Sequence, residues 1–166
     1  AARTHALAET PGERETYFKT NVEGMKELLG ALEGAGEVRV VFASSVKACG
    51  EETPASGVDE LAPSRPTTPY GESKLAAERA LLSSEFGREA VVLRLAMVYG
   101  SGQKGNLVEM IRSVAKDRFP PIPENGNRRS MVHVDDVVTA LLAAAEASRP
   151  GGRMYYISGL RARSSR

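Results

Sequence analysis

The sequence has no tryptophan, only one cysteine and no excess of charge of either sign. Because Cys49 has no second cysteine to pair with, an internal disulfide is excluded, and a reducing cytoplasm is the expected location. The 22 basic and 21 acidic residues leave a net charge of +1, so we expect neither nucleic acid nor a membrane surface as a partner. The longest apolar helix that we expect, over residues 137–147, is shorter than the roughly 20 residues needed to cross a bilayer.

Helix-like and strand-like segments alternate along the 166 residues. A hydrophobic content of 42% and a charged content of 26% are ordinary for a folded domain. The spacing of apolar residues predicts helices over residues 13–33, 70–86, 106–116 and 135–147, strands over 38–43, 90–95 and 153–158, and a long loop over 51–69. This order predicts an α/β fold with a parallel sheet.

Tyr70 and Lys74 lie one helical turn apart at the start of the predicted helix 70–86. Residues at this spacing share a helical face, so the phenol and the ammonium can meet one substrate. A free tyrosine has a pKa of about 10 and is a poor base at neutral pH, but a nearby cation lowers that pKa. Such a tyrosine can exchange a proton with a sugar hydroxyl while hydride moves to or from a nicotinamide. The alternative is a surface pair, because Y-x-x-x-K alone is a weak motif.

Two serines, Ser44 and Ser45, follow the apolar run 38–43. Open α/β sheets bind ligands at the carboxyl ends of their strands, and Ser45 precedes Tyr70 by 25 residues. A hydroxyl there can hydrogen-bond the same substrate oxygen that the tyrosine deprotonates. A polar strand end that starts a loop is the alternative. The order of strand, serine pair and Y-x-x-x-K favours a catalytic group of Ser45, Tyr70 and Lys74.

Five segments, taken in order, resemble the extended short-chain dehydrogenase/reductase family. They are residues 21–25 (N-V-E-G-M), 42–50 (F-A-S-S-V-K-A-C-G), 70–74 (Y-G-E-S-K), 93–100 (L-R-L-A-M-V-Y-G) and 129–137 (R-S-M-V-H-V-D-D-V). The pattern is most similar to the branch of NAD-dependent sugar-nucleotide epimerases and dehydratases, and within it to UDP-sugar 4-epimerases. The resemblance implies a Rossmann-like, doubly wound parallel sheet.

The resemblance also assigns roles to individual residues and implies NAD as the cofactor. Tyr70 would be the general base and acid, Lys74 would tune it and bond the nicotinamide ribose, and Ser45 would bond the reacting oxygen. Cofactor contacts are implied for Ala1, Ala2, Asn21, Ser44, Tyr70 and Lys74. Substrate contacts are implied for Ser45, Asn106 and Arg129, of which the planar arginine fork suits a diphosphate.

Plain structural roles stay open for several of these residues. Asn21 could be an exposed helix asparagine, Asn106 could serve as an N-cap as well as a ligand, and Arg129 could be a solvated surface charge. Residues 133–136 (H-V-D-D) look like a metal trio at first sight. Their spacing is not a known ligand pattern, so we expect no metal site.

The glycine-rich turn G-x-x-G-x-x-G with which the family begins is absent. Ala1 and Ala2 instead resemble the H-L-A-A-R end of the family's fourth strand. We therefore interpret the chain as an internal fragment, with residues 1–100 as the C-terminal half of the Rossmann-like domain. Residues 101–166 would be part of the substrate-binding lobe plus the last sheet strand. A sheet of about three strands would leave the strand 38–43 exposed, which predicts a homo-oligomer or association with another chain.

The resemblance implies NAD-dependent epimerisation at C4 of a nucleotide-activated sugar by transient oxidation, in surface-polysaccharide biosynthesis. A 4-ketoreductase or a dehydratase is an alternative, although dehydratases usually place an Asp-Glu pair where Val46 and Lys47 stand. Met97 stands near the position where some epimerases carry an asparagine, which weakens a specific assignment to UDP-glucose. A third possibility is an inactive chain that only binds a partner or a nucleotide sugar, because NAD affinity without the glycine-rich turn should be negligible.

Overall fold

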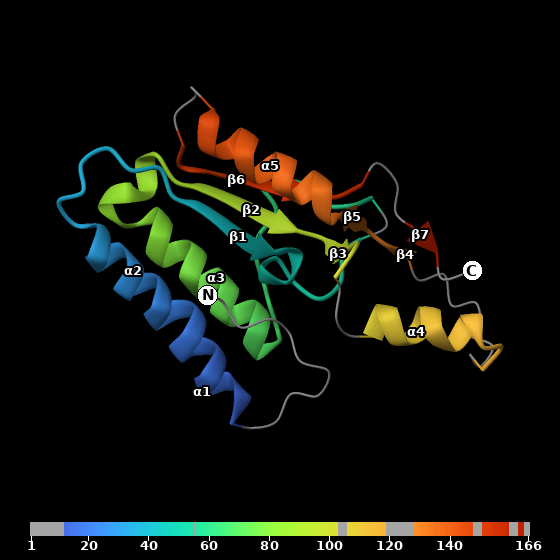
Figure 1. The fold of residues 1–166 in the computed structure, drawn as a ribbon. Helices are drawn as coiled ribbons and strands as arrows, with labels where there is room; N and C mark the ends of the chain where they lie inside the picture. Colours follow the sequence, from blue (N-terminus) through green and yellow to red (C-terminus); the bar gives the residue numbers. More distant parts are fainter. Residues whose placement is uncertain are drawn as a thin grey trace.

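A three-stranded parallel sheet forms the centre of the fold (Figure 1). The computed structural model describes residues 12–54, 56–102, 106–118, 128–147, 151–159 and 163–164. Strands β1 (Val41–Ser45), β2 (Val91–Leu95) and β6 (Arg153–Ile157) lie in the order β1-β2-β6. Their register places Ser45 opposite Leu95 and Leu95 opposite Ile157, so the three strands end at one edge. The predicted α/β fold with a parallel sheet is confirmed.

The middle strand, β2, is the most buried element of the sheet. Val91, Val92 and Leu93 are each at most 6% exposed, as expected for a parallel strand that is covered on both faces. Strand β1 is only half-buried along most of its length. It begins three residues later than the predicted strand 38–43 and contains both serines as its last residues.

One long helical rod and the helix beside it cover one face of the sheet, and α5 (Val134–Glu146) covers the other (Figure 1). The rod consists of α1 (Glu13–Tyr17), η1 (Phe18–Glu23) and α2 (Gly24–Leu32), and its neighbour is α3 (Pro69–Leu82). The rod confirms the helix predicted over residues 13–33, except that its middle turn, η1, is π-helical. A π-helical turn admits one extra residue per turn and is often found at functional sites.

Apolar side chains fill the space between the rod, α3 and the sheet. Leu29 of α2, Leu81 of α3 and Val92 of β2 belong to this buried cluster. A second, smaller cluster beneath α5 contains Ala96, Val132 and Val137. The sheet is therefore held between two apolar layers, which fixes the strand ends relative to α3.

Helix α3 begins and ends at polar caps. The Thr68 side chain accepts a hydrogen bond from Gly71 N, and Pro69 occupies the first turn, where its missing N–H costs nothing. The helix ends at Leu82 rather than at the predicted residue 86. The Ser83 and Ser84 hydroxyls donate to the carbonyls of Arg79 and Leu81, and the chain then continues as the 3₁₀ turn η3 (Glu85–Arg88).

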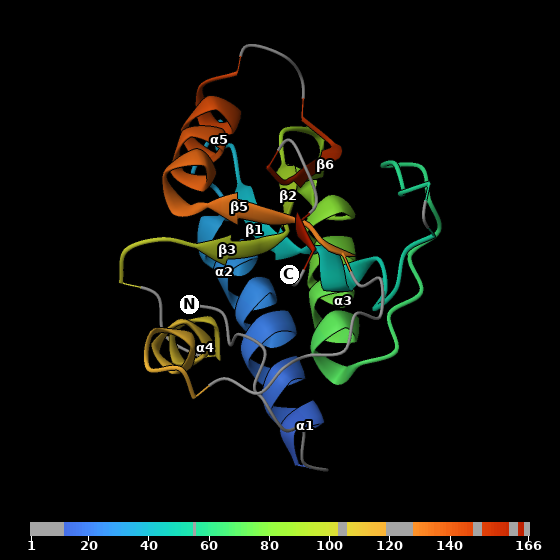
Figure 2. The same ribbon diagram turned by 90° about the vertical axis from the view of Figure 1, so that its right-hand side faces the viewer.

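Two small sheets lie beyond the ends of the main strands. Strands β3 (Met97–Tyr99) and β5 (Met131–His133) pair in parallel, and α5 lies over them (Figure 2). Strands β4 (Arg128–Arg129) and β7 (Arg163–Ser164) pair antiparallel. Strands β3, β4 and β7 were not predicted from the sequence. The turn η2 (Val46–Ala48) follows β1, and α4 (Asn106–Ala115) confirms the helix predicted from residue 106.

Candidate active site

Ser45, Tyr70 and Lys74 meet at the edge of the sheet where β1 ends and α3 begins. The Tyr70 hydroxyl forms a hydrogen bond with the Ser45 side chain. Ser45 itself caps the turn η2, since its hydroxyl accepts from Lys47 N at 3.2 Å. The structure thus brings together the three residues that the sequence nominated for catalysis.

Tyr70 is buried, with 8% of its surface exposed. Burial raises the pKa of Tyr70 above its ordinary value of 10.0, the hydrogen bond with Ser45 opposes this, and the Tyr17 phenol raises it further. The Tyr17 ring meets the Tyr70 ring edge-on, with centroids 5.6 Å apart. This differs from the expectation that Lys74 lowers the pKa of Tyr70.

Lys74 does not lower the pKa of Tyr70 in this way because its side chain points toward β1. Its Nζ donates to the carbonyl oxygen of Ala43 at 3.0 Å and lies 4.6 Å from the centre of the Phe42 ring. Burial lowers the pKa of Lys74 from 10.5 to about 8, and the nearby Glu78 carboxylate opposes that effect. The cation is held against β1, and it remains mostly protonated at neutral pH.

Asn21 supports the helix that carries Tyr70. Its amide donates to the Ser73 hydroxyl at 2.9 Å, and that hydroxyl donates to the Tyr70 carbonyl at 2.8 Å. Both side chains are buried, and Asn21 lies in the π-helical turn η1. The structure therefore excludes an exposed helix asparagine, while the cofactor contact implied for Asn21 stays a prediction. This role of Ser73 was not predicted from the sequence. The available signal was a small hydroxyl residue inside the Y-G-E-S-K segment.

Ser44 points away from the group that Ser45 joins. It is 4% exposed, and its hydroxyl is hydrogen-bonded to the Glu78 carboxylate. A cofactor contact by Ser44 would have to use its backbone, and it stays a prediction. Glu78 also forms a buried ion pair with Arg94 of β2, another pair that sequence reasoning missed. A charged residue inside the apolar run of β2 was the available signal, because a buried charge needs a partner.

The predicted substrate residues lie on other elements. Arg129 is an exposed residue of β4, and Asn106 begins α4. Figure 1 shows β4 and α4 on the side toward which β1 and β2 point, which is where the carboxyl ends of the strands lie. Ala1 and Ala2 fall outside the described residues, so their predicted cofactor contacts are not tested.

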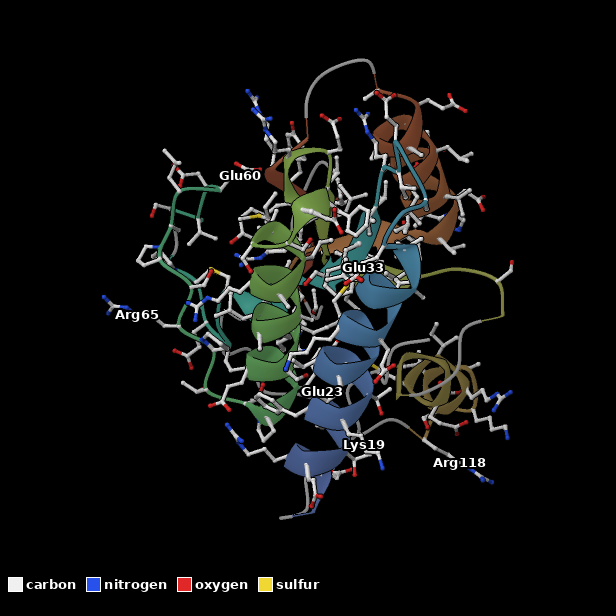
Figure 3. The ribbon with its side chains drawn as sticks, turned by 90° about the vertical axis from the view of Figure 1, so that its left-hand side faces the viewer. Lys19, Glu23, Glu33, Glu60, Arg65 and Arg118 are labelled. Atoms are coloured by element: carbon white, nitrogen blue, oxygen red, sulfur yellow. The ribbon has the colours of Figure 1, made fainter. Side chains whose placement is uncertain are left out.

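An open pocket of about 720 Å³ lies along the long loop after β1, and Ser45, Tyr70 and Lys74 are not among its lining residues. Residues 51–54 and 56–68 of this predicted loop form neither helix nor strand, whereas Pro69 already belongs to α3. Cys49, Glu51, Asp59 and Arg65 are among the residues that line the pocket. Glu60 of the same loop reaches back to the sheet, where its carboxylate accepts from Tyr156 N at 3.2 Å (Figure 3). The loop is therefore tied to β6.

Among the described residues, no group of three or more His, Cys, Asp or Glu side chains is placed to hold a metal ion. His133 serves as the N-cap of α5, since its Nδ1 accepts from Asp135 N at 3.3 Å. In the same part of the chain, no helix is long and apolar enough to cross a membrane.

The sequence is similar to a known protein family and to individual proteins. The sequence pattern of the NAD dependent epimerase/dehydratase family matches residues 1–158. The UDP-glucose 4-epimerase of Vibrio cholerae is 30% identical over 168 residues, which cover 95% of this chain and 50% of that protein. The UDP-glucose 4-epimerase of Streptomyces lividans is 34% identical over 155 residues, which cover 82% of this chain and 46% of that protein.

Solved structures show the same fold. MoeE5 in complex with UDP-glucose and NAD superposes with a TM-score of 0.82 at 30% identity, over 99% of this chain and 56% of that one. UDP-glucuronic acid 4-epimerase from Bacillus cereus in complex with NAD gives a TM-score of 0.81 at 25% identity, over 96% and 53%. The chain thus spans about half the length of the relatives that it matches.

Proposed function

The chain belongs to the NAD dependent epimerase/dehydratase family, and we propose that it carries the catalytic group of an enzyme that epimerises C4 of a nucleotide-activated sugar. The observation that supports this most directly is the meeting of Ser45, Tyr70 and Lys74 at the carboxyl edge of a parallel sheet. The described relatives include UDP-sugar 4-epimerases. The division into a cofactor part, residues 1–100, and a substrate part, residues 101–166, belongs to the same proposal.

Each residue of the group has one task in this reaction. Tyr70 takes the proton of the C4 hydroxyl as the alcohol is oxidised and returns it when the ketone is reduced. Ser45, already hydrogen-bonded to Tyr70, bonds the same substrate oxygen and fixes its position. Lys74 supplies a buried positive charge beside them. NAD, when bound, supplies the reversible hydride acceptor, so the overall reaction is redox-neutral.

The residues present fit the nicotinamide ribose end of NAD. An ammonium can donate three hydrogen bonds, and the contact of Lys74 with Ala43 uses one. Lys74, Tyr70 and the backbone at Ser44 would hold this end of the cofactor. The pyrophosphate end needs backbone N–H groups in a glycine-rich turn, which the 166 residues do not contain as G-x-x-G-x-x-G.

A dehydratase and an epimerase differ in the residues expected directly after Ser45. A dehydratase would place acidic residues after Ser45, whereas Val46 and Lys47 stand there and Lys47 is ion-paired with Glu51. This observation favours epimerisation or 4-keto reduction. An inactive chain that only binds a partner or a nucleotide sugar is the second candidate. It is favoured by the missing glycine-rich turn.

Several finer assignments accompany the proposal. Asn106 and Arg129 would contact the substrate, and Ala1, Ala2 and Asn21 would contact the cofactor. A cytoplasmic role in polysaccharide biosynthesis fits the relatives that act on nucleotide sugars. A homo-oligomer fits a strand β1 that pairs on one side only among the described strands.

Two measurements on the 166-residue chain test the proposed function. If a partner chain supplies the pyrophosphate cradle, calorimetric titration with NAD and with UDP-glucose should show binding of both, and NMR of the sugar protons should show interconversion of UDP-glucose and UDP-galactose. Tyr70→Phe should abolish turnover, while Tyr155→Phe should preserve it because Tyr155 is an exposed residue of β6. Absence of NAD binding would reject the proposal for this chain in favour of the inactive alternative.

A further inference from the structure

A buried ion pair lies directly behind the catalytic group. Arg94 Nη2 donates to Glu78 Oε2 at 2.6 Å and Arg94 Nε donates to Glu78 Oε1 at 3.0 Å. The two side chains are only 3% and 4% exposed. Removing two charges from water costs more than most such pairs return, so stability alone does not account for a pair at this position.

Two further donors of Arg94 are also engaged. Nη1 donates to the Tyr156 hydroxyl at 3.1 Å on β6, and Nη2 donates to the Ser64 hydroxyl at 2.9 Å in the long loop. A planar guanidinium that is bonded on three sides has a single orientation. Arg94 therefore fixes the position of the Glu78 carboxylate.

Glu78 in turn interacts with Lys74 and with the residue next to Ser45. It lies one helical turn after Lys74 on the same face of α3, and its charge favours the protonated form of Lys74. It also accepts the hydroxyl of Ser44, the residue that precedes Ser45. Lys74 itself is bonded to Ala43 on the same strand. The hydrogen bond of Glu78 with Ser44 and that of Lys74 with Ala43 thus both join α3 to the end of β1.

We propose that Glu78 is a positioning residue for the catalytic group: fixed by Arg94, it keeps the buried Lys74 ammonium charged and holds the strand end that carries Ser45. The inference rests on the proposed function, because only that function requires Lys74 as a cation. Neither Glu78 nor Arg94 has to touch the substrate for this role.

Other titratable groups lie near Lys74, and their charges also bear on its titration midpoint. Tyr70 lies one turn before it on α3, and the Tyr17 phenol of α1 lies behind Tyr70. From β1, Lys74 meets only the Phe42 ring and the Ala43 carbonyl among the contacts of the described residues. Arg94 of β2 lies beyond Glu78. Glu78 is the carboxylate whose charge acts on Lys74.

The test follows Lys74 directly by NMR of the full chain with ¹³C at the lysine Cε positions, and its resonance is assigned by its loss in Lys74→Met. In Glu78→Gln the titration midpoint of Lys74 should move to lower pH than in the wild type. Glu89→Gln is the matched control, because it removes the same charge from an exposed Arg–Glu pair with Arg39 near the start of β2. It should leave the midpoint unchanged.

The double variant Glu78→Leu/Arg94→Met is a second test in case Glu78→Gln does not fold, because apolar replacement of a whole buried pair is often tolerated. It should show the same downward movement in a chain that keeps its wild-type amide spectrum. An unchanged Lys74 midpoint in either folded variant would overturn the inference, as would an equal movement in Glu89→Gln. The titration needs neither NAD nor sugar, so its outcome is independent of the binding measurements that test the proposed function.

Discussion

Lys74 Nζ lies 3.0 Å from the carbonyl oxygen of Ala43, so the cation of the catalytic group is tied to the end of β1. This contact explains why its charge does not act as the main influence on Tyr70. The pKa of the Tyr70 phenol is set by burial, by the hydrogen bond with Ser45 and by Tyr17. A positive charge brought close to the phenol is what would favour the phenolate.

The buried charge of Lys74 predicts a specific dependence of stability on pH. Its pKa is depressed to about 8 in the folded chain against 10.5 when exposed, so the unfolded chain binds more protons between these values. The free energy of unfolding from this group therefore rises as pH increases from 8 to 10.5. Lys74→Met should remove a rise on the order of 3 kcal/mol. Urea denaturation of both chains at several pH values measures it, and parallel curves would contradict the prediction.

The Tyr70 phenol should titrate above pH 10, and its midpoint should move in opposite directions in two variants. Ser45→Ala removes the hydrogen bond that lowers the pKa, so the midpoint should rise. Tyr17→Phe removes the phenol that raises the pKa, so the midpoint should fall. The difference in phenolate absorbance between each chain and its Tyr70→Phe counterpart isolates this one tyrosine. Movement of both midpoints in the same direction would refute the assigned causes.

Breaking the buried pair from one side should be costly. Glu78→Ala leaves the buried Arg94 charged and without its carboxylate partner, so we expect a loss of about 3–5 kcal/mol in the free energy of unfolding. Glu89→Ala breaks the exposed pair with Arg39 and should cost at most about 1 kcal/mol. Denaturant titration compares the two. Similar losses in both variants would show that burial of the pair has no energetic consequence.

Two helical glycines should respond oppositely to alanine. A Cβ at Gly71 would collide with the Lys47 carbonyl and approach Pro66, whereas a Cβ at Gly24 would meet nothing within 4 Å. Gly71→Ala should therefore cost about 1–3 kcal/mol through overpacking beside Tyr70. Gly24→Ala should stabilise the rod by about 0.5–1 kcal/mol. Thermal unfolding of both variants is the measurement, and a stabilised Gly71→Ala would contradict the close packing of α3 on η2.

Local sequence patterns predicted the parts of the fold that local chemistry decides. The helical rod follows from apolar residues at helical spacing, and the catalytic group follows from Y-x-x-x-K behind a strand that ends in two serines. The end of α3 was misplaced because Ser83 and Ser84 compete for helical carbonyls, which apolar spacing does not register. The short strand β3 was missed because it forms by pairing with β5, which is distant in sequence.

The direction of side chains was the least predictable part of the site. Nothing in the spacing of Tyr70 and Lys74 indicates that the ammonium turns toward Ala43 or that Ser44 turns toward Glu78. Both directions are set by the register of β1 against α3 and by the charge pair on β2. Such relationships join residues that are distant in sequence, so they emerge only when the elements pack.

The parallel sheet has a consequence for the order in which the chain folds. Its pairings join residue 41 to 91 and residue 91 to 153, and closing such long loops costs chain entropy before any contact compensates for it. The hydrogen bond between Ser45 and Tyr70 closes a far shorter segment. Joining Ser45 to Tyr70 therefore costs less loop-closure entropy than either pairing of the main sheet, so we expect the contact between β1 and α3 to form before the sheet β1-β2-β6 is complete.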